Sequence, residues 1–232
     1  MDGGTQGNLF DRAYEEIEEL IVACRLRPGQ LLSIQELQAL TGLGRTPVYQ
    51  AVSRLAADTL IQIRARHGLR IAPVDLGRER MLLQLRRDVE RFVIRLAAER
   101  SDASHRNQLL HLARALRSGM TVDDFNRLDR RLDRLLIAMA GEPFLEHTLR
   151  PLHTISRRIG WIYHTSMTEP GMLRRTINSH LAVVDAVANR DADKAVAASD
   201  ALIDFADSMF DVLEREIDPS LLDCGLEPLV RG

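Results

Sequence analysis

Apolar residues recur at helical spacing along most of the chain, and an alternating pattern is confined to one short stretch. Residues 9–24 carry an apolar face with four glutamates off it, which predicts an amphipathic helix. Long helical patterns dominate the second part and cover residues 78–100, 104–117, 122–140, 142–166, 170–189 and 191–216. No extended run there alternates with a period of two. The sequence therefore predicts a mainly α protein whose larger part is an all-α helical bundle.

Between these regions, two short helical patterns meet at a glycine and are followed by a strand-like pattern. Ser33, with Glu36 three positions later, forms a capping box that begins the first helix, and Gly42 ends it. The second helix begins around Thr46 and Pro47, because a proline at the first helical position lacks only an N–H that has no helical partner. Residues 60–71 read as a hairpin with a basic, glycine-containing tip. This order predicts a winged helix-turn-helix, which places one helix in the DNA major groove.

The pattern divides the chain into three parts. Residues 1–75 form the predicted DNA-binding domain, and its first eight residues, which are polar and glycine-rich, are expected to be a loose arm. Residues 78–217 form the predicted helical domain for effector binding and dimerisation. Residues 218–232 hold two prolines and no clear period, which predicts a C-terminal tail.

Charge is distributed unevenly. The 232-residue chain has a net charge of −2, yet residues 25–73 hold seven arginines against two acids, an excess of +5. A local basic patch is expected of a nucleic-acid-binding module, although an ordinary arginine-rich surface has the same composition. The two cysteines lie 200 residues apart, which fits neither a metal site nor a disulfide framework. With a polar N-terminus and no apolar run long enough for a bilayer, we expect a cytoplasmic protein without membrane association.

The segment Gly44 to Val52, GRTPVYQAV, resembles the SRTPVREAL-like recognition helix of the GntR family of bacterial regulators. The helical part resembles the effector domain of the FadR-type subfamily, the FCD domain, through Leu85–Glu90, Ala138–Pro143 and His180–Val187. The resemblance covers almost the whole chain and implies a homodimer that binds a roughly palindromic operator in double-stranded DNA, usually as a repressor. It further implies that a small organic-acid effector, bound in the helical domain, changes the affinity for DNA.

The predicted DNA-binding residues lie on the recognition helix and the wing. They are Arg45, Thr46, Tyr49, Gln50, Arg54, Arg66, His67 and Gly68. Arg45 can reach guanine or phosphate, while Tyr49 replaces the second arginine of the family pattern and cannot bind guanine with two hydrogen bonds. We therefore expect an operator that differs from the common family consensus. Arg54 has an alternative role, which is to pair with a nearby acid.

The resemblance also implies a divalent metal ion, held in many members by an aspartate, a histidine four residues later and two further histidines. Here the matching positions are Asp129, Asp133, His180 and Leu202, so one ligand is changed and one is lost. The three remaining groups predict one divalent ion, Zn²⁺, Mn²⁺ or Ni²⁺, with the oxygen-rich set favouring harder ions. The alternative is that the two aspartates pair with arginines and that His180 is a neutral hydrogen-bonding group.

The predicted effector-binding residues are Arg86, His153, Arg157 and His180. Arg86 matches an arginine that often lines the family cavity, where it could hold a carboxylate bidentately, or else it pairs with Glu90. His153 and Arg157 follow at helical spacing, together with Trp161 and His164, but the same spacing suits a partly exposed face.

Two further function classes remain open. One is a metal-dependent enzyme in which Asp129, Asp133 and His180 act on a small molecule and the winged helix serves only to target it. The chain carries no nucleophile elbow, phosphate-binding loop, HExxH motif or dinucleotide-binding turn, so we expect a non-enzymatic protein. The other is an architectural DNA binder without an effector, which a helical domain lacking a cavity would favour.

Overall fold

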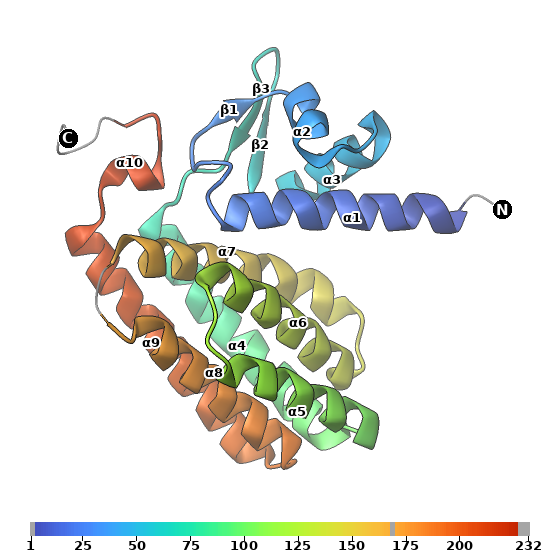
Figure 1. Ribbon diagram of the computed structural model, residues 1–232, viewed down its shortest axis with the longest axis vertical. Helices are drawn as coiled ribbons and strands as arrows, with labels where there is room; N and C mark the ends of the chain where they lie inside the picture. Colours follow the sequence, from blue (N-terminus) through green and yellow to red (C-terminus); the bar gives the residue numbers. More distant parts are fainter. Residues whose placement is uncertain (1–2, 168–169, 227–232) are drawn as a thin grey trace. The chain divides into compact units, whose positions relative to one another are not determined.

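The computed structural model describes residues 3–167 and 170–226 and shows a chain of two compact units (Figure 1). The first unit joins Met1–Asp75 to Ile217–Gly232, and the second is Leu76–Glu216. Within the described residues, every helix is too short or too polar to span a bilayer.

The first unit is a three-helix core with a small sheet. Its helices are α1 (Gly3–Val22), α2 (Ile34–Thr41) and α3 (Arg45–Ala57). Its strands are β1 (Leu31–Leu32), β2 (Ile61–Arg64) and β3 (Gly68–Ile71), which pair antiparallel in the order β1-β3-β2. This is the predicted winged helix-turn-helix, in which the β2–β3 hairpin is the wing.

The helix-turn-helix forms because its ends are specified locally. The Ser33 hydroxyl accepts the Glu36 N–H at 3.2 Å, the Glu36 carboxylate accepts the Ser33 N–H at 2.6 Å, and the capping box is thereby confirmed. Gly42 ends α2 with a left-handed φ of 66°. The next helix begins at Arg45, one residue earlier than predicted, so that Pro47 lies inside the first turn, where backbone N–H groups still have no helical partner.

The sheet contains one strand, β1, that the sequence pattern did not reveal. Leu31 and Leu32 of β1 pair with Arg70 and Leu69, and two residues are too few to show an alternation. Gly68 makes this third strand possible. Its φ is +80°, and a Cβ there would lie 2.8 Å from the carbonyl oxygen of Leu32.

The first helix begins earlier than predicted. It starts at Gly3, within the segment expected to be a loose arm, so that expectation was wrong for the described residues. The physical reason is that extending an existing helix adds a hydrogen bond for each residue fixed, and no proline stands in this segment to stop it.

The second unit is all-helical, as predicted. Its helices are α4 (Leu76–Arg100), α5 (Ala103–Arg117), α6 (Val122–Ala140), α7 (Phe144–Ser166), α8 (Met172–Ala188) and α9 (Ala192–Glu216). Helix α4 contacts α6, α7, α8 and α9 and so lies at the centre of the bundle (Figure 1). The core consists mainly of leucine, valine, isoleucine and alanine side chains on the inner faces of these helices, with Phe125 and Met139 among them.

The chain after α9 packs onto the first unit. A short helix, α10 (Pro219–Leu222), leads to Asp223, whose carboxylate lies 2.6 Å from the Arg70 guanidinium of β3. The Cys224 N–H donates to the Pro28 carbonyl at 2.8 Å, and the Val74 N–H donates to the Leu222 carbonyl at 2.8 Å. Residues 218–226, which were predicted to belong to a C-terminal tail, are therefore part of the winged-helix unit, and so is Ile217, which was predicted to belong to the helical domain.

Gly29 lies under this segment and leads to a first prediction. Its φ is +81°, and a Cβ would lie 1.9 Å from the Asp223 carboxylate oxygen. We expect Gly29→Ala to lower the free energy of unfolding of this unit by about 1–3 kcal/mol, from left-handed strain and displacement of Asp223. Denaturant unfolding followed by circular dichroism measures the change.

Gly44→Ala is the matched control, because Gly44 has a negative φ of −67° and its added Cβ would meet nothing closer than Pro47 Cδ at 3.9 Å. Adding Asp223→Ala to the Gly29→Ala chain relieves the contact and leaves the backbone strain. Equal stabilities for Gly29→Ala and Gly44→Ala would contradict this account of the segment.

Candidate functional site

The outer face of α3 presents the predicted DNA-reading residues to solvent. Arg45, Thr46, Tyr49 and Gln50 are all exposed, and 57% of Tyr49 is accessible. The opposite face buries Val48, Ala51, Val52 and Leu55 completely, which fixes the helix on its unit. A rigid helix with a polar, hydrogen-bonding outer face is what major-groove reading requires.

Arg54 differs from these four residues. Its Nε donates to the Asp58 carboxylate at 3.2 Å, and the Tyr14 hydroxyl donates to the same carboxylate at 2.8 Å. Asp58 is buried, so Arg54 contributes to its neutralisation. The structure thus gives Arg54 the internal partner that the sequence left as an alternative to a DNA contact.

The wing tip is exposed and basic. Arg64, Arg66 and His67 are exposed, and the stretch 61–71 contains no acid. Arg66 has a left-handed φ of 66°, and the His67 N–H closes the turn on the Arg64 carbonyl at 3.0 Å. These side chains can meet a negatively charged surface. Gly68 already has a structural role in the close approach of β1.

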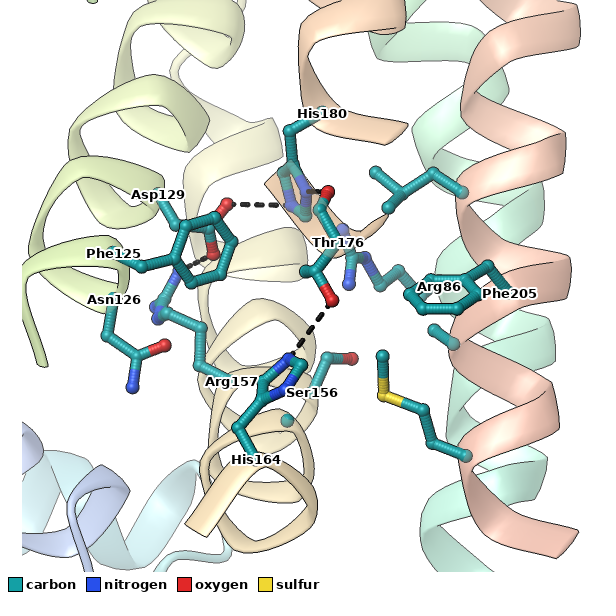
Figure 2. A pocket seen from close by; sticks show the side chains of 14 residues that line it. Arg86, Phe125, Asn126, Asp129, Ser156, Arg157, His164, Thr176, His180 and Phe205 are labelled. Atoms are coloured by element: carbon teal, nitrogen blue, oxygen red, sulfur yellow. Dashed lines mark hydrogen bonds and ion pairs between the residues drawn. The ribbon is translucent and has the colours of Figure 1, made fainter. Parts of the chain in front are cut away.

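A small cavity of about 50 Å³ lies inside the helical unit (Figure 2). Helices α4, α6, α7, α8 and α9 all contribute to its wall. The lining residues are Arg86, Phe125, Asn126, Asp129, Ser156, Arg157, Gly160, His164, Thr176, His180, Leu202, Phe205, Ala206 and Met209. The volume is enough for a few water molecules or a small polar group.

Polar side chains form a connected row along one wall of this cavity (Figure 2). His180 Nε2 lies 3.0 Å from an Asp129 carboxylate oxygen, and His180 Nδ1 donates to the Thr176 carbonyl at 2.8 Å. The Thr176 hydroxyl lies 3.0 Å from His164 Nε2. Because a carbonyl only accepts, the Nδ1 contact orients the His180 ring with Nε2 toward Asp129.

Arg157 joins the two aspartates of α6. Its guanidinium forms a very short hydrogen bond with Asp133 and lies 3.8 Å from Asp129, and it donates to the Thr154 hydroxyl at 3.2 Å. Arg157, Asp129 and Asp133 are each buried, with 7% of each residue accessible. The i, i+4 spacing does place both carboxylates on one helix face, and the group that they share is a guanidinium.

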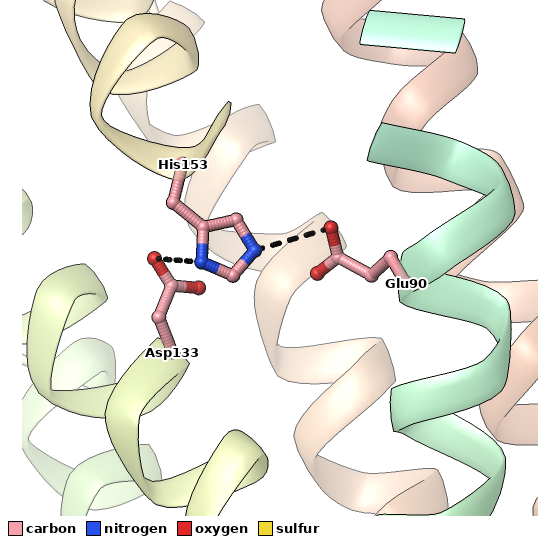
Figure 3. Close-up of side chains that lie close together, drawn as sticks. All are labelled: Glu90, Asp133 and His153. Atoms are coloured by element: carbon pink, nitrogen blue, oxygen red, sulfur yellow. Dashed lines mark hydrogen bonds and ion pairs between the residues drawn. The ribbon is translucent and has the colours of Figure 1, made fainter. Parts of the chain in front are cut away.

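A second cluster brings together one buried polar side chain each from α4, α6 and α7 (Figure 3). His153 Nε2 is 3.3 Å from Glu90, and His153 Nδ1 is 3.2 Å from Asp133. The donor atoms of these three buried residues lie within 4.8 Å of one another, so the group could hold a metal ion by spacing alone. Glu90, however, accepts two hydrogen bonds from Arg86, at 2.5 and 3.4 Å.

The environment shifts several pKa values. Burial alone would raise the pKa of Asp129. The facing His180 and then Arg157 lower it by more than burial raises it, so the pKa falls to about 2. The pKa of Asp133 is raised, first by burial and then by the charge of Asp129. Burial lowers the pKa of His180, while Asp129 raises it by more, so the net direction is upward. This favours an ionised Asp129 facing a protonated His180.

The predicted metal ligands do not form one convergent set of donors. Asp129 faces His180, whereas Asp133 faces Arg157 and His153. Leu202 lines the cavity as a buried apolar side chain where the resemblance implies a fourth ligand. The residues therefore do not fit a divalent metal, because the Arg157 guanidinium contacts both carboxylates and Leu202 offers no ligand atom.

Three of the four predicted effector-binding residues line the cavity: Arg86, Arg157 and His180. His153 lies behind them against a smaller void, and Trp161 is turned to Asp123, with a hydrogen bond of 2.9 Å. The lining of the cavity also includes the apolar side chains of Phe125, Phe205 and Met209, which were not predicted from the sequence as site residues. In the sequence these residues belong to the apolar faces of predicted helices, and such a pattern does not distinguish the wall of a cavity from a solid core.

A winged helix joined to a helical bundle with an internal cavity defines the class of this protein, and comparison with known proteins gives the family. Residues 9–71 match the model described as bacterial regulatory proteins, gntR family, and residues 81–205 match the FCD domain. The chain belongs to the GntR family of bacterial transcription regulators and carries an FCD domain. The family consists of DNA-binding regulators, so the protein is not an enzyme.

Individual relatives agree with this assignment. The HTH-type transcriptional repressor RspR of Escherichia coli (strain K12) is 30% identical over 183 residues, which cover 78% of this chain and 79% of that protein. The HTH-type transcriptional repressor NanR of Citrobacter rodentium (strain ICC168) is 29% identical over 215 residues, which cover 81% and 79%. The solved structure of E. coli McbR/YncC has a similar fold, with a TM-score of 0.75 at 17% identity over 89% of this chain and 98% of that one.

His164 leads to a prediction about pH. Burial, and then the nearby His180, lower its pKa from 6.5 to about 4, so between these values the unfolded chain binds a proton that the folded chain does not. This contribution to stability is complete above pH 6.5 and is lost as the pH falls toward 4. We expect His164→Asn to flatten the dependence of unfolding free energy on pH in this window, by up to one proton.

The exposed His111 provides the control, and His111→Asn is measured in the same way. Denaturant titrations at several pH values give the slopes. A His164→Asn chain with the wild-type slope would show that His164 is not held neutral by its surroundings.

Proposed function

We propose that this regulator is a homodimeric repressor that binds a two-fold operator and whose affinity for DNA is controlled by a small carboxylate in the cavity of the helical unit. The observation that supports it most is the pairing of two features in one chain. One is an exposed, polar recognition helix, and the other is an internal cavity whose wall carries two guanidiniums and two imidazoles.

The DNA-binding half of the proposal assigns separate tasks to helix and wing. Arg45 and Gln50 read base edges in the major groove, since a guanidinium matches guanine and a carboxamide matches adenine. Thr46 and the free N–H groups at the start of α3 bind phosphate. Tyr49 contacts phosphate or a thymine methyl group. The wing residues Arg66 and His67 meet the DNA backbone or the minor groove.

Repression and the two-fold operator are proposed from the relatives. RspR and NanR are named transcriptional repressors, and a dimer of this chain would present two α3 helices related by two-fold symmetry. A symmetric dimer reads an inverted repeat, so the two half-sites should be equivalent. The cytoplasm, where such a regulator meets DNA, is the proposed location.

The effector half of the proposal rests on the cavity. Arg86, Arg157 and His180 line it together, and charge-assisted hydrogen bonds from such groups favour an anionic ligand. Phe125, Phe205 and Met209 supply an apolar wall for the rest of a small molecule. This internal space favours an effector-controlled regulator over the architectural DNA binder that the sequence left open.

The proposal includes no metal-dependent step. The sequence predicted one divalent ion at Asp129, Asp133 and His180, and these residues do not fit it, for the reasons given above. The effector is therefore placed against the protein's own side chains.

Arg45 tests the DNA-binding half. We expect Arg45→Ala to weaken binding to an operator by about 1–3 kcal/mol, roughly 5- to 150-fold, because a guanidinium at the helix start is removed. Fluorescence anisotropy on a labelled duplex selected with the parent protein measures the affinity. Arg12→Ala, at an exposed arginine paired with Glu16 on α1, should bind like the parent. Undiminished affinity of Arg45→Ala would contradict the proposed contact.

Gly160 tests the effector half, because it lines the cavity without a side chain. A Cβ added there would meet no described heavy atom within 4 Å, so Gly160→Leu should fill the cavity without disturbing the helix. We expect this variant to bind operator normally and to lose the response to every carboxylate that shifts DNA affinity in the parent.

Gly119→Leu is the control, since Gly119 is exposed and equally uncrowded but does not line the cavity. The measurement is operator affinity with and without a panel of small mono- and dicarboxylates. A Gly160→Leu chain that responds like the parent would place the effector elsewhere.

A further inference from the structure

The two buried aspartates of α6 share one positively charged group. Asp129 and Asp133 lie four residues apart on the inner face of the helix, and the Arg157 guanidinium of α7 contacts both. Two carboxylates this close repel one another in a poorly solvated interior unless a cation lies between them. Arg157 supplies that cation from the chain itself.

Arg157 is held in this position on several sides. Its guanidinium also donates to the Thr154 hydroxyl at 3.2 Å, one turn earlier on α7, and only 7% of the residue is accessible. Moving it away would remove the one guanidinium that contacts both buried carboxylates, which is a costly change in a poorly solvated interior. The contact is thus part of the folded core.

Each carboxylate of the surrounding cluster already lies against nitrogen groups of the chain itself. Glu90 contacts Arg86 and His153, Asp129 contacts Arg157 and His180, and Asp133 contacts Arg157 and His153. A divalent cation would add two positive charges to this desolvated cluster. It would also have to displace Arg157, since the guanidinium already occupies the space between the carboxylates.

The remaining coordination position is apolar. Leu202 of α9 is buried and lines the cavity together with His180, and its side chain offers no ligand atom. His180, by contrast, keeps the orientation that a metal ligand would need, with Nδ1 bound to the Thr176 carbonyl. The chain therefore retains part of a metal-binding arrangement and closes the rest of it with Arg157 and Leu202.

We propose that Arg157 serves as the built-in cation of the Asp129–Asp133 pair and that this cavity is a metal-independent ligand site. Its ligand is a small organic acid held by hydrogen bonds and apolar contact, and it needs no metal-chelating groups. The inference concerns the cavity of the proposed function, but its test reads metal binding and not DNA binding. Either one can therefore fail without the other.

The experiment compares four full-length chains: the wild type, Leu202→His, Arg157→Gln, and the double variant Arg157→Gln/Leu202→His. Each is stripped with a chelator, dialysed against Zn²⁺, Mn²⁺ or Ni²⁺, passed through a desalting column and analysed for metal by elemental mass spectrometry. Thermal unfolding with and without each ion is a second readout, because an ion that binds only the folded chain raises the midpoint.

We expect the wild type and Leu202→His to retain only substoichiometric metal and to show no shift in midpoint. The double variant should retain about one ion per chain and gain several degrees, because the imidazole introduced by Leu202→His completes a four-ligand set with Asp129, Asp133 and His180. Arg157→Gln replaces the guanidinium with a shorter, neutral amide, so it should be less stable than the wild type.

Three outcomes would overturn the proposal. They are a full equivalent of metal in the wild type, metal uptake by Leu202→His equal to that of the double variant, and a folded double variant that takes up no metal. If the double variant does not fold, the wild type and Leu202→His still decide, because both keep Arg157 and a full equivalent of metal in either chain overturns the proposal.

Discussion

The guanidinium of Arg157 lies between two carboxylates that the helical repeat of α6 places four residues apart, and this buried ion pair determines what the helical unit can hold. It neutralises charge where solvent cannot and fixes α7 against α6. It leaves His180 to pair with Asp129 along the cavity wall. The polar side of the cavity is consequently a balanced network of protein groups, and the apolar side, which includes Phe205 and Met209, provides room for a small molecule.

The winged-helix unit follows the same principle, in which an exposed functional surface is supported by a rigid interior. The buried stripe of α3 and the carboxylate of Asp58, held by Tyr14 and Arg54, fix the helix whose other face carries Arg45 and Gln50. The segment after α9 is held on the strand β3 of this unit by the ion pair between Asp223 and Arg70. Helix α9, which lines the cavity, leads directly into that segment. The chain therefore passes between the two units twice, after Asp75 and after Glu216.

Most of the fold could be predicted from the sequence, because the helices are long, strongly periodic and ended by recognisable residues such as Ser33, Gly42 and Gly141. Short elements escaped prediction. Two residues of β1 and four of α10 show no period, and their stability comes from partners distant in sequence, such as Leu69 for Leu32. The cavity residues Arg86, Arg157 and His180 were found through a family resemblance and a spacing. The contacts of Arg157 with Asp129 and Asp133 could not be predicted, since an i, i+4 pair of aspartates suits a metal ion and a guanidinium equally well. Which of the two lies between them depends on tertiary packing.

The central claim is that the exposed face of α3 reads a specific DNA sequence through a symmetric dimer. The most direct measurement is selection from a random duplex library with the full-length protein, followed by sequencing of the bound fraction over several rounds. The account predicts enrichment of one motif arranged as an inverted repeat, with half-sites that share one sequence. It is contradicted if no motif is enriched over the starting library, or if the bound fraction reflects only nonspecific affinity that disappears as salt is raised.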